Sequence, residues 1–223
     1  MAAATTTSPW RAALTFAATT GVIAISFGVL ARTSGVTLVM TCVMSLIVFA
    51  GGAQFLAVAT IASGGTPLAA VLGGIVLNAR HLPYGFAIAP LLRGPWWKRA
   101  LSSHIVLDES TALALAQPTP ELGRLAFYAC GCMLFAFWNV GTLVGALAGG
   151  AIADPSALGL DAAFPASMLA LLSPLMRQRD MRTAALAGAA IALAATPFTA
   201  PGVPILLAAA GVLAARLIRE ETA

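Results

Sequence analysis

The sequence has few charged residues, and this scarcity decides the class of protein. Only 9% of its 223 residues are Asp, Glu, Lys or Arg, whereas a soluble domain usually has about 25%. A water-soluble globule is therefore excluded, and so is a disordered chain, because disordered chains are polar and rich in charge. Apolar residues make up 60% of the chain, and the mean hydropathy is +0.93. The composition predicts an integral membrane protein.

Cysteine and histidine are scarce as well. The three cysteines, Cys42, Cys130 and Cys132, lie in apolar stretches, and an odd number inside predicted spans argues against a disulfide framework. With two histidines and no Cys/His cluster, we do not expect a dedicated metal site. The G-x-S-x-G, H-E-x-x-H and phosphate-loop signatures are missing too. We therefore predict neither an enzyme nor a bound cofactor.

The net charge of +4 does not indicate a nucleic-acid partner. Basic residues stand in small groups between apolar runs, as they do in the cytoplasmic loops of membrane proteins. This distribution places the C-terminus in the cytoplasm. The groups are Arg93, Lys98 and Arg99, then Arg177, Arg179 and Arg182, and finally Arg216 and Arg219.

The apolar runs are rich in Ala and Leu, and most exceed the roughly 9–11 residues of a barrel strand. We predict an all-α, polytopic transmembrane helix bundle of about seven spans, forming one membrane domain over residues 1–223. The less apolar stretch 100–116 is either an amphipathic helix or a partly membrane-embedded segment. The spans are expected at about 14–31, 36–62, 67–92, 122–152, 160–176, 183–195 and 203–218.

Two of these runs contain segments that are unusual for helices facing lipid. Segment 49–55 reads FAGGAQF, and segment 77–84 reads LNARHLPY, a polar cluster that contains Pro83. Pro83 cannot donate a backbone hydrogen bond to the carbonyl of Ala79. Because broken backbone at membrane depth survives only inside protein or along a cavity, we predict discontinuous helices near residues 50–55 and 78–84.

Arg80 lies near the middle of its run, where a lone Arg costs about 2.5–3.5 kcal/mol on insertion scales. Asn78, His81 and Tyr84 are three residues apart and share one helix face. We interpret this cluster as a substrate site in which Arg80 pairs with a carboxylate and the others offer hydrogen bonds. The alternative is a helix that ends early, with Arg80 snorkelling to the headgroups.

Gly51, Gly52 and Gln54 are candidates for the same site. A helix broken here would expose backbone amides that bind an anion at a half-helix N-terminus. The alternative is that the glycines only permit close helix packing. Trp138 and Asn139, in the long fourth run, are further candidates for lining this cavity.

Two carboxylates, Asp108 and Glu109, are candidates for proton coupling. A carboxylate at membrane depth is a candidate for carrying a proton. The alternative for Asp108 and Glu109 is a cytoplasmic amphipathic helix whose acids lie in water. His104 stands one helical turn before Asp108, so these two side chains could pair.

These segments together resemble the AzlC family of branched-chain amino acid exporters. The resemblance rests on 49–55 and 77–84, and on 107–110 (LDES) and 159–166 (GLDAAFPA), and it covers nearly the whole chain. Gly51 stands where the family usually has Ser, and Pro83 where it has Leu or Met.

The resemblance implies a multi-pass subunit of the inner (plasma) membrane that exports valine, leucine and isoleucine, and in some members methionine. It also implies a small hydrophobic partner subunit of the AzlD type. Export against a gradient would need coupling, for which protons are the expected ion and His81, Asp108 and Glu109 are the candidate carriers. The competing hypothesis is a non-transporting assembly or sensory component whose intramembrane polar residues bind a partner subunit.

Overall fold

The computed structural model describes residues 9–150, 159, 162, 166, 169, 172–173, 175–200 and 202–213. Secondary structure in this part of the chain is helical throughout, which confirms the predicted all-α class. The α-helices are α1 (Pro9–Thr33), α2 (Leu38–Val48), α3 (Gly51–Ala62), α4 (Pro67–Asn78), α5 (His81–Ile88), α6 (Trp96–Ser103), α7 (Asp108–Leu115), α8 (Pro120–Gly149), α10 (Arg179–Ala195) and α11 (Val203–Ala208). Short 3-10 helices are η1 (Ala89–Leu91), η3 (Leu175–Arg177) and η4 (Thr196–Phe198).

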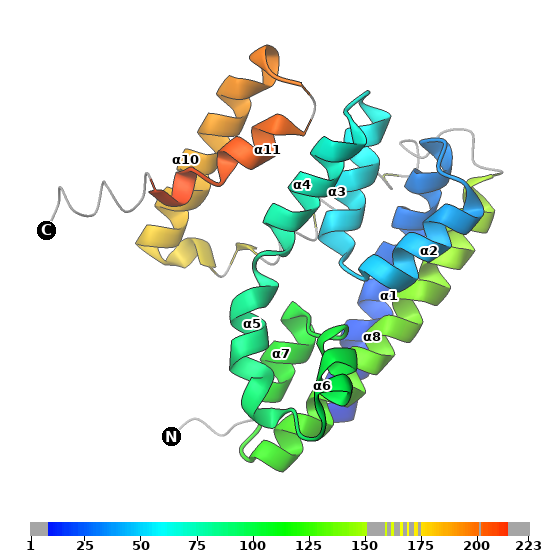
Figure 1. The fold of residues 1–223 in the computed structure, drawn as a ribbon, viewed down its shortest axis with the longest axis vertical. Coiled ribbons are helices and arrows are strands. Elements are labelled where there is room, and N and C mark those ends of the chain that lie inside the picture. Colours follow the sequence, from blue (N-terminus) through cyan, green and yellow to red (C-terminus); the bar gives the residue numbers. More distant parts are fainter. Residues whose placement is uncertain are drawn as a thin grey trace, which may run out of the picture.

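The centre of the molecule is the pair α1 and α8, which run side by side along most of their length (Figure 1). Both are long and apolar enough to cross a membrane, as is the run Arg179–Phe198 formed by α10 and η4. Glycines let the two backbones touch. A Cβ atom on Gly28 would lie 2.3 Å from the Thr142 carbonyl oxygen, and one on Gly145 only 2.0 Å from that of Ile25. Small residues are typical where membrane helices cross closely.

The predicted span 36–62 consists of two helices, because the chain turns sharply between α2 and α3. Phe49 ends α2 with a φ of +38°, a left-handed conformation that the α-helix cannot continue. After Ala50 the chain becomes helical again at Gly51. The discontinuity predicted near residues 50–55 is therefore confirmed, and it lies at the N-terminal edge of that range.

The predicted span 67–92 is interrupted as well. Helix α4 ends at Asn78 and α5 begins at His81, so the interruption comes at Ala79 and Arg80. This confirms the discontinuity predicted near residues 78–84. Pro83 lies in the first turn of α5, where a missing N–H breaks no helical hydrogen bond. The Ala79 carbonyl accepts from the N–H of Leu82 instead, at 3.1 Å.

The stretch 100–116 contains part of α6, all of α7 and the non-helical link between them. In Figure 1, α2 and α3 form a hairpin whose tip lies near the middle of α8. Helices α6 and α7 form a second hairpin that reaches the middle from the opposite end, while α4 and α5 follow one another past both tips (Figure 1). Three interruptions of the helical backbone are thus brought to the same level of the molecule.

The C-terminal part is a hairpin of α10 and α11 that packs against α4. The predicted span 183–195 lies within α10, and 203–218 begins as α11. Most of the predicted span 160–176, like residues 214–218, lies outside the described residues. The total of seven spans stays a prediction.

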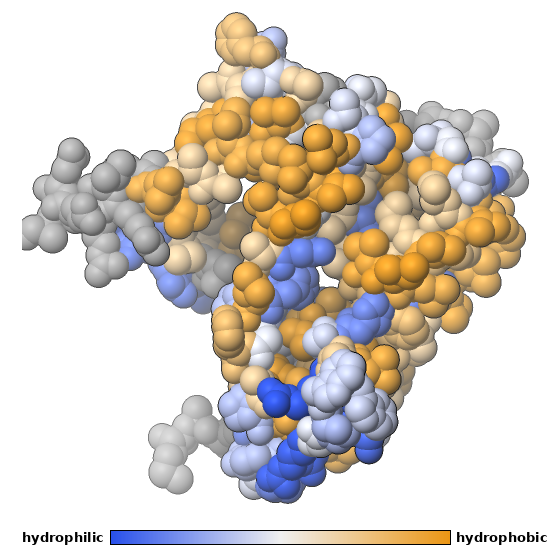
Figure 2. Space-filling view, viewed as in Figure 1, coloured by the Kyte–Doolittle hydropathy of each residue, from blue (hydrophilic) through white to orange (hydrophobic). Residues whose placement is uncertain are grey.

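The outside of the molecule is strongly apolar. Large side chains such as Val39, Leu68 and Phe198 are at least 66% exposed, which suits contact with lipid rather than water. Figure 2 shows hydrophobic side chains over most of the visible face, and hydrophilic ones gathered at its lower end and around the hollow in its centre.

Candidate functional site

The two hairpin tips touch each other in the middle of the molecule. The Nε2–H of His104, between α6 and α7, donates to the Leu46 carbonyl near the end of α2, at 2.9 Å. The rings of Phe49 and His104 lie 5.7 Å apart, and both pack against Phe135 of α8. These contacts join the interruption after α2 to the one before α7.

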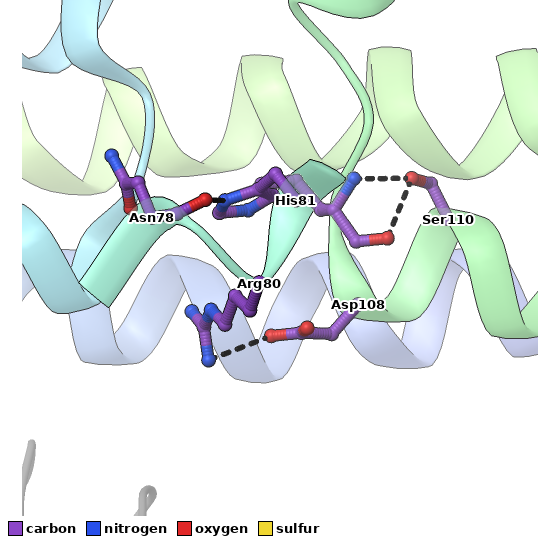
Figure 3. A network of polar contacts seen from close by, with 6 residues as sticks. Asn78, Arg80, His81, Asp108 and Ser110 are labelled. Atoms are coloured by element: carbon purple, nitrogen blue, oxygen red, sulfur yellow. Dashed lines mark hydrogen bonds and ion pairs between the residues drawn. The ribbon is translucent and has the colours of Figure 1, made fainter. Parts of the chain in front are cut away.

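The third interruption reaches the same place through an ion pair. Nη1 of Arg80, between α4 and α5, lies 3.1 Å from Oδ2 of Asp108, the first residue of α7 (Figure 3). The two side chains are 31% and 19% exposed. Beside Arg80, the Nδ1–H of His81 donates to the Asn78 carbonyl at 3.0 Å and bridges the gap between α4 and α5. A carboxylate at a helix N-terminus also interacts favourably with the helix dipole.

The start of α7 is fixed by hydrogen bonds around Ser110. Its hydroxyl accepts from the Leu107 N–H at 2.9 Å and donates to the Ile105 carbonyl at 2.8 Å. Ile105 packs against Gly131 of α8, where a Cβ atom would come within 2.8 Å of it. This local folding places Asp108 opposite Arg80.

A cleft of about 1280 Å³ opens beside the ion pair. Its charged and strongly polar walls come from α4–α5 and α7, while α1, α3 and other helices supply apolar side chains. The polar lining residues include Arg80, Tyr84, Asp108, Glu109 and Thr111. The apolar lining includes Phe16, Leu30, Phe55, Leu56, Val58, Leu77, Leu115, Leu172 and Ile205.

Several buried polar atoms around the interruptions have no hydrogen-bond partner within the described part of the chain. Buried polar groups are nearly always hydrogen-bonded in folded proteins, so a cluster of unused donors and acceptors marks a candidate site. Gln54 is the extreme case, since its side chain is fully buried and neither amide atom is bonded. The other atoms of this kind in this region are Asn78 Oδ1, Arg80 Nε, Asp108 Oδ1, Thr111 Oγ1 and Trp138 Nε1.

Gly51 and Gly52, which were predicted to belong to the site, bring the N-terminus of α3 into this cluster. A Cβ atom on Gly51 would lie 2.6 Å from the ring of Trp138, and one on Gly52 would lie 3.6 Å from Nη2 of Arg80. Ala50, which precedes them, gives α3 no side-chain cap. The N–H groups of the first turn, which have no partner within the helix, therefore begin beside Trp138 and Arg80.

The remaining candidates occupy different places. Tyr84 lines the cleft, and its ring packs edge to face against that of His81, at 6.0 Å. Asn139 lies at the contact between α2 and α8, where it accepts from the Ser45 hydroxyl at 2.8 Å and donates to the Phe135 carbonyl. Asn139 is not among the described residues that line the cleft.

One pair expected from the sequence is not formed, and one residue of the site gave no signal in the sequence. The expected pairing of His104 with Asp108 is wrong, because the chain between them is not helical and each has another partner. Thr111 was not a candidate, although it lines the cleft with an unbonded hydroxyl and is only 4% exposed. A threonine inside an α-helix gives no signal until its burial and its missing partner are known.

The fold and this cluster define a class: a multi-pass helical membrane protein whose interrupted helices enclose a polar site, an arrangement known from transporters. Residues 15–152 match the family described as "AzlC protein". The chain belongs to the AzlC family, which confirms the resemblance noted in its sequence.

Named relatives agree with this assignment. An uncharacterized membrane protein of Archaeoglobus fulgidus is 34% identical over 84% of this chain and 83% of its own length. One from Helicobacter pylori strain J99 is 26% identical over 56% of each chain. The "Branched-chain amino acid transport protein AzlC" of Bacillus subtilis is 23% identical over 86% of this chain and 77% of its own. No solved structure matches the chain.

Proposed function

We propose that this protein is the large subunit of a plasma-membrane transporter that exports branched-chain amino acids, and methionine, from the cytoplasm. The observation that carries the proposal is the ion pair of Arg80 and Asp108 beside a largely apolar cleft, surrounded by unused polar atoms. The printed name of the Bacillus subtilis relative supports the substrate class. The partner is a small hydrophobic membrane subunit of the AzlD type.

The cleft offers each part of such a substrate a matching surface. An amino acid needs a cation or helix N–H groups for its carboxylate, and Arg80 and the uncapped start of α3 lie side by side. Its ammonium group needs acceptors. Gln54 and Asn78 have oxygens without a partner among the described residues, but neither residue is among the described ones that line the cleft. The branched side chain needs apolar walls, which Leu56, Leu77 and their neighbours provide.

Coupling to protons requires an ionisable group that the substrate or a proton can reach. Asp108 and Glu109 line the cleft directly, and His81 contacts the lining residue Tyr84. These three residues are the carriers we propose. Because these residues lie beside the substrate site, a change in their charge on protonation would alter the affinity for substrate, and bound substrate would alter their affinity for protons.

The test is efflux from cells loaded with a dipeptide that contains valine or isoleucine. The wild-type chain, expressed with its small partner, should accelerate the appearance of the free amino acid outside. Arg80→Ala should lower this rate at least about tenfold, because a hydrogen bond to a charged group is worth about 1.5–3 kcal/mol. Gly85→Ala is the matched control, since a Cβ atom there meets open space on the same helix as the site.

The result also separates transport from the competing class. If both chains reach the membrane and efflux does not rise, the chain is better described as a non-transporting component. If Arg80→Ala stays in the membrane and binds its partner but no longer exports, the cluster acts on substrate. Loss of assembly in that variant would instead make the polar cluster structural.

A further inference from the structure

We propose that Asp108 and Thr111 hold the ammonium group of the substrate while Arg80 holds its carboxylate. The ion pair between Arg80 and Asp108 is then the empty form of a site built for a zwitterion. This inference rests on the proposed function and adds the ligands of the ammonium group. It also names the charge pattern that a substrate must have.

The ion pair leaves each of its two partners with one buried polar atom that makes no hydrogen bond among the described residues. Nη1 of Arg80 meets Oδ2 of Asp108 at 3.1 Å. The Nε of Arg80 and the Oδ1 of Asp108 are buried but bond to nothing in the described part of the molecule. A guanidinium can bind a carboxylate through two N–H groups at once, and an aspartate can accept on both oxygens. One donor and one acceptor of opposite charge are thus available side by side.

Thr111 places a second acceptor close to Asp108. It stands three residues after Asp108 in α7, so the two side chains share a helix face. Both residues line the cleft, and the Thr111 hydroxyl is buried without a partner among the described residues. An ammonium group has three N–H donors and needs several acceptors. Asp108 Oδ1 and Thr111 Oγ1 supply two of them on one wall of the cleft.

The charges of Arg80 and Asp108 favour a ligand that carries both a negative and a positive group. A zwitterion that enters between Arg80 and Asp108 replaces one ion pair by two, with no change in the net charge of the site. A substrate with only a carboxylate or only an amine leaves one of the two ions without a partner. Leaving a buried or partly buried charge unpaired is costly, as is leaving a built hydrogen-bonding site unfilled. The site should therefore reject the keto acid and the amine that have the shape of leucine.

The experiment is counterflow in proteoliposomes that contain the protein with its small partner. Counterflow needs binding and translocation but no net proton movement, so it tests the substrate site apart from coupling. The probes are leucine, its keto acid 4-methyl-2-oxopentanoate, and isopentylamine. The test variants are Asp108→Asn and Thr111→Val. The control is Glu121→Gln, which also removes one carboxylate. The Glu121 side chain is 63% exposed, and Glu121 is not among the described residues that line the cleft.

The wild type should exchange leucine and reject both analogues. Asp108→Asn should lose at least about tenfold in leucine exchange and gain exchange of the keto acid, because Arg80 no longer has a resident anion. Thr111→Val should raise the half-saturating leucine concentration about tenfold without admitting the keto acid. Glu121→Gln should behave as the wild type.

The outcomes separate this inference from the proposed function. Absence of leucine counterflow in the wild type overturns both. Normal wild-type counterflow, with Asp108→Asn still preferring leucine to the keto acid, overturns the inference alone. If Asp108→Asn does not fold, Thr111→Val decides, and an unchanged half-saturating concentration in that variant overturns the proposed ammonium site.

Discussion

The close contact of α1 with α8 predicts a large effect from a single added methyl group. In Gly145→Ala the new Cβ would lie 2.0 Å from the Ile25 carbonyl oxygen and 2.8 Å from its carbonyl carbon. Real Cβ contacts are essentially never shorter than 3.0 Å, so the two backbones must separate by about 1 Å. Overpacking typically lowers the free energy of unfolding by about 1–3 kcal/mol. Because this clash is with backbone of the central helix pair, we expect a loss near the upper end of that range.

The assay is thermal unfolding of the purified protein in detergent. A loss of about 3 kcal/mol corresponds to a fall in Tm of about 6–12 °C for a chain of this size. Gly150→Ala is the control, because its Cβ would lie at an ordinary 3.6 Å from the Leu147 carbonyl oxygen. If Gly145→Ala melts at the wild-type temperature, the backbones of α1 and α8 are not in contact and this part of the reasoning is refuted.

Two further predictions concern contacts between the hairpin of α2 and α3 and helix α8. Gly51→Ala would place a Cβ 2.6 Å from the Trp138 ring. This variant should lower the rate of leucine counterflow about tenfold or more, since displacements of about 1 Å near a site can be that costly. A normal rate would contradict the packing of Gly51 against Trp138. Ser45→Ala removes the donor to Asn139 Oδ1 and a contact with the buried Thr142 hydroxyl. It should cost about 1–3 kcal/mol in thermal unfolding, and an unchanged Tm would count against that network.

The helices and their interruptions could be predicted from the sequence because each depends on residues that are neighbours along the chain. Long Ala- and Leu-rich runs favour helices in a membrane, and glycines or polar residues within such runs mark interruptions. The segment around Gly51 and the segment around Arg80 were found in this way. Pro83 fits this interpretation, because it lies in the first turn of the helix that restarts after Arg80, and the Ala79 carbonyl accepts from Leu82 instead.

The contacts that the site residues make with one another could not be predicted from the sequence in this way. Arg80 precedes α5 and Asp108 begins α7, and only the packing of α5 against α7 brings them together. The expected pair of His104 and Asp108 assumed a continuous helix, yet residues 104–107 lie outside α6 and α7. Periodicity predicts which side chains share a face within a helix, but tertiary contacts decide which helices meet.

Thr111 shows what the three-dimensional structure adds. Its neighbours in sequence give it no special character, and a threonine in a helix often bonds to the carbonyl of the preceding turn. Here its hydroxyl is buried beside charged residues without a partner among the described residues. A polar atom becomes informative when burial and an unused hydrogen bond occur together.

The central claim is that substrate binds where the three interruptions meet, and the most direct measurement is an experimental structure of the protein with leucine bound. We expect the leucine carboxylate against Arg80, its ammonium group against Asp108 and Thr111, and its side chain among the apolar residues of the cleft. The ion pair of Arg80 and Asp108 should be opened in that structure. Leucine bound elsewhere, with the 3.1 Å contact between Arg80 and Asp108 intact, would contradict the claim.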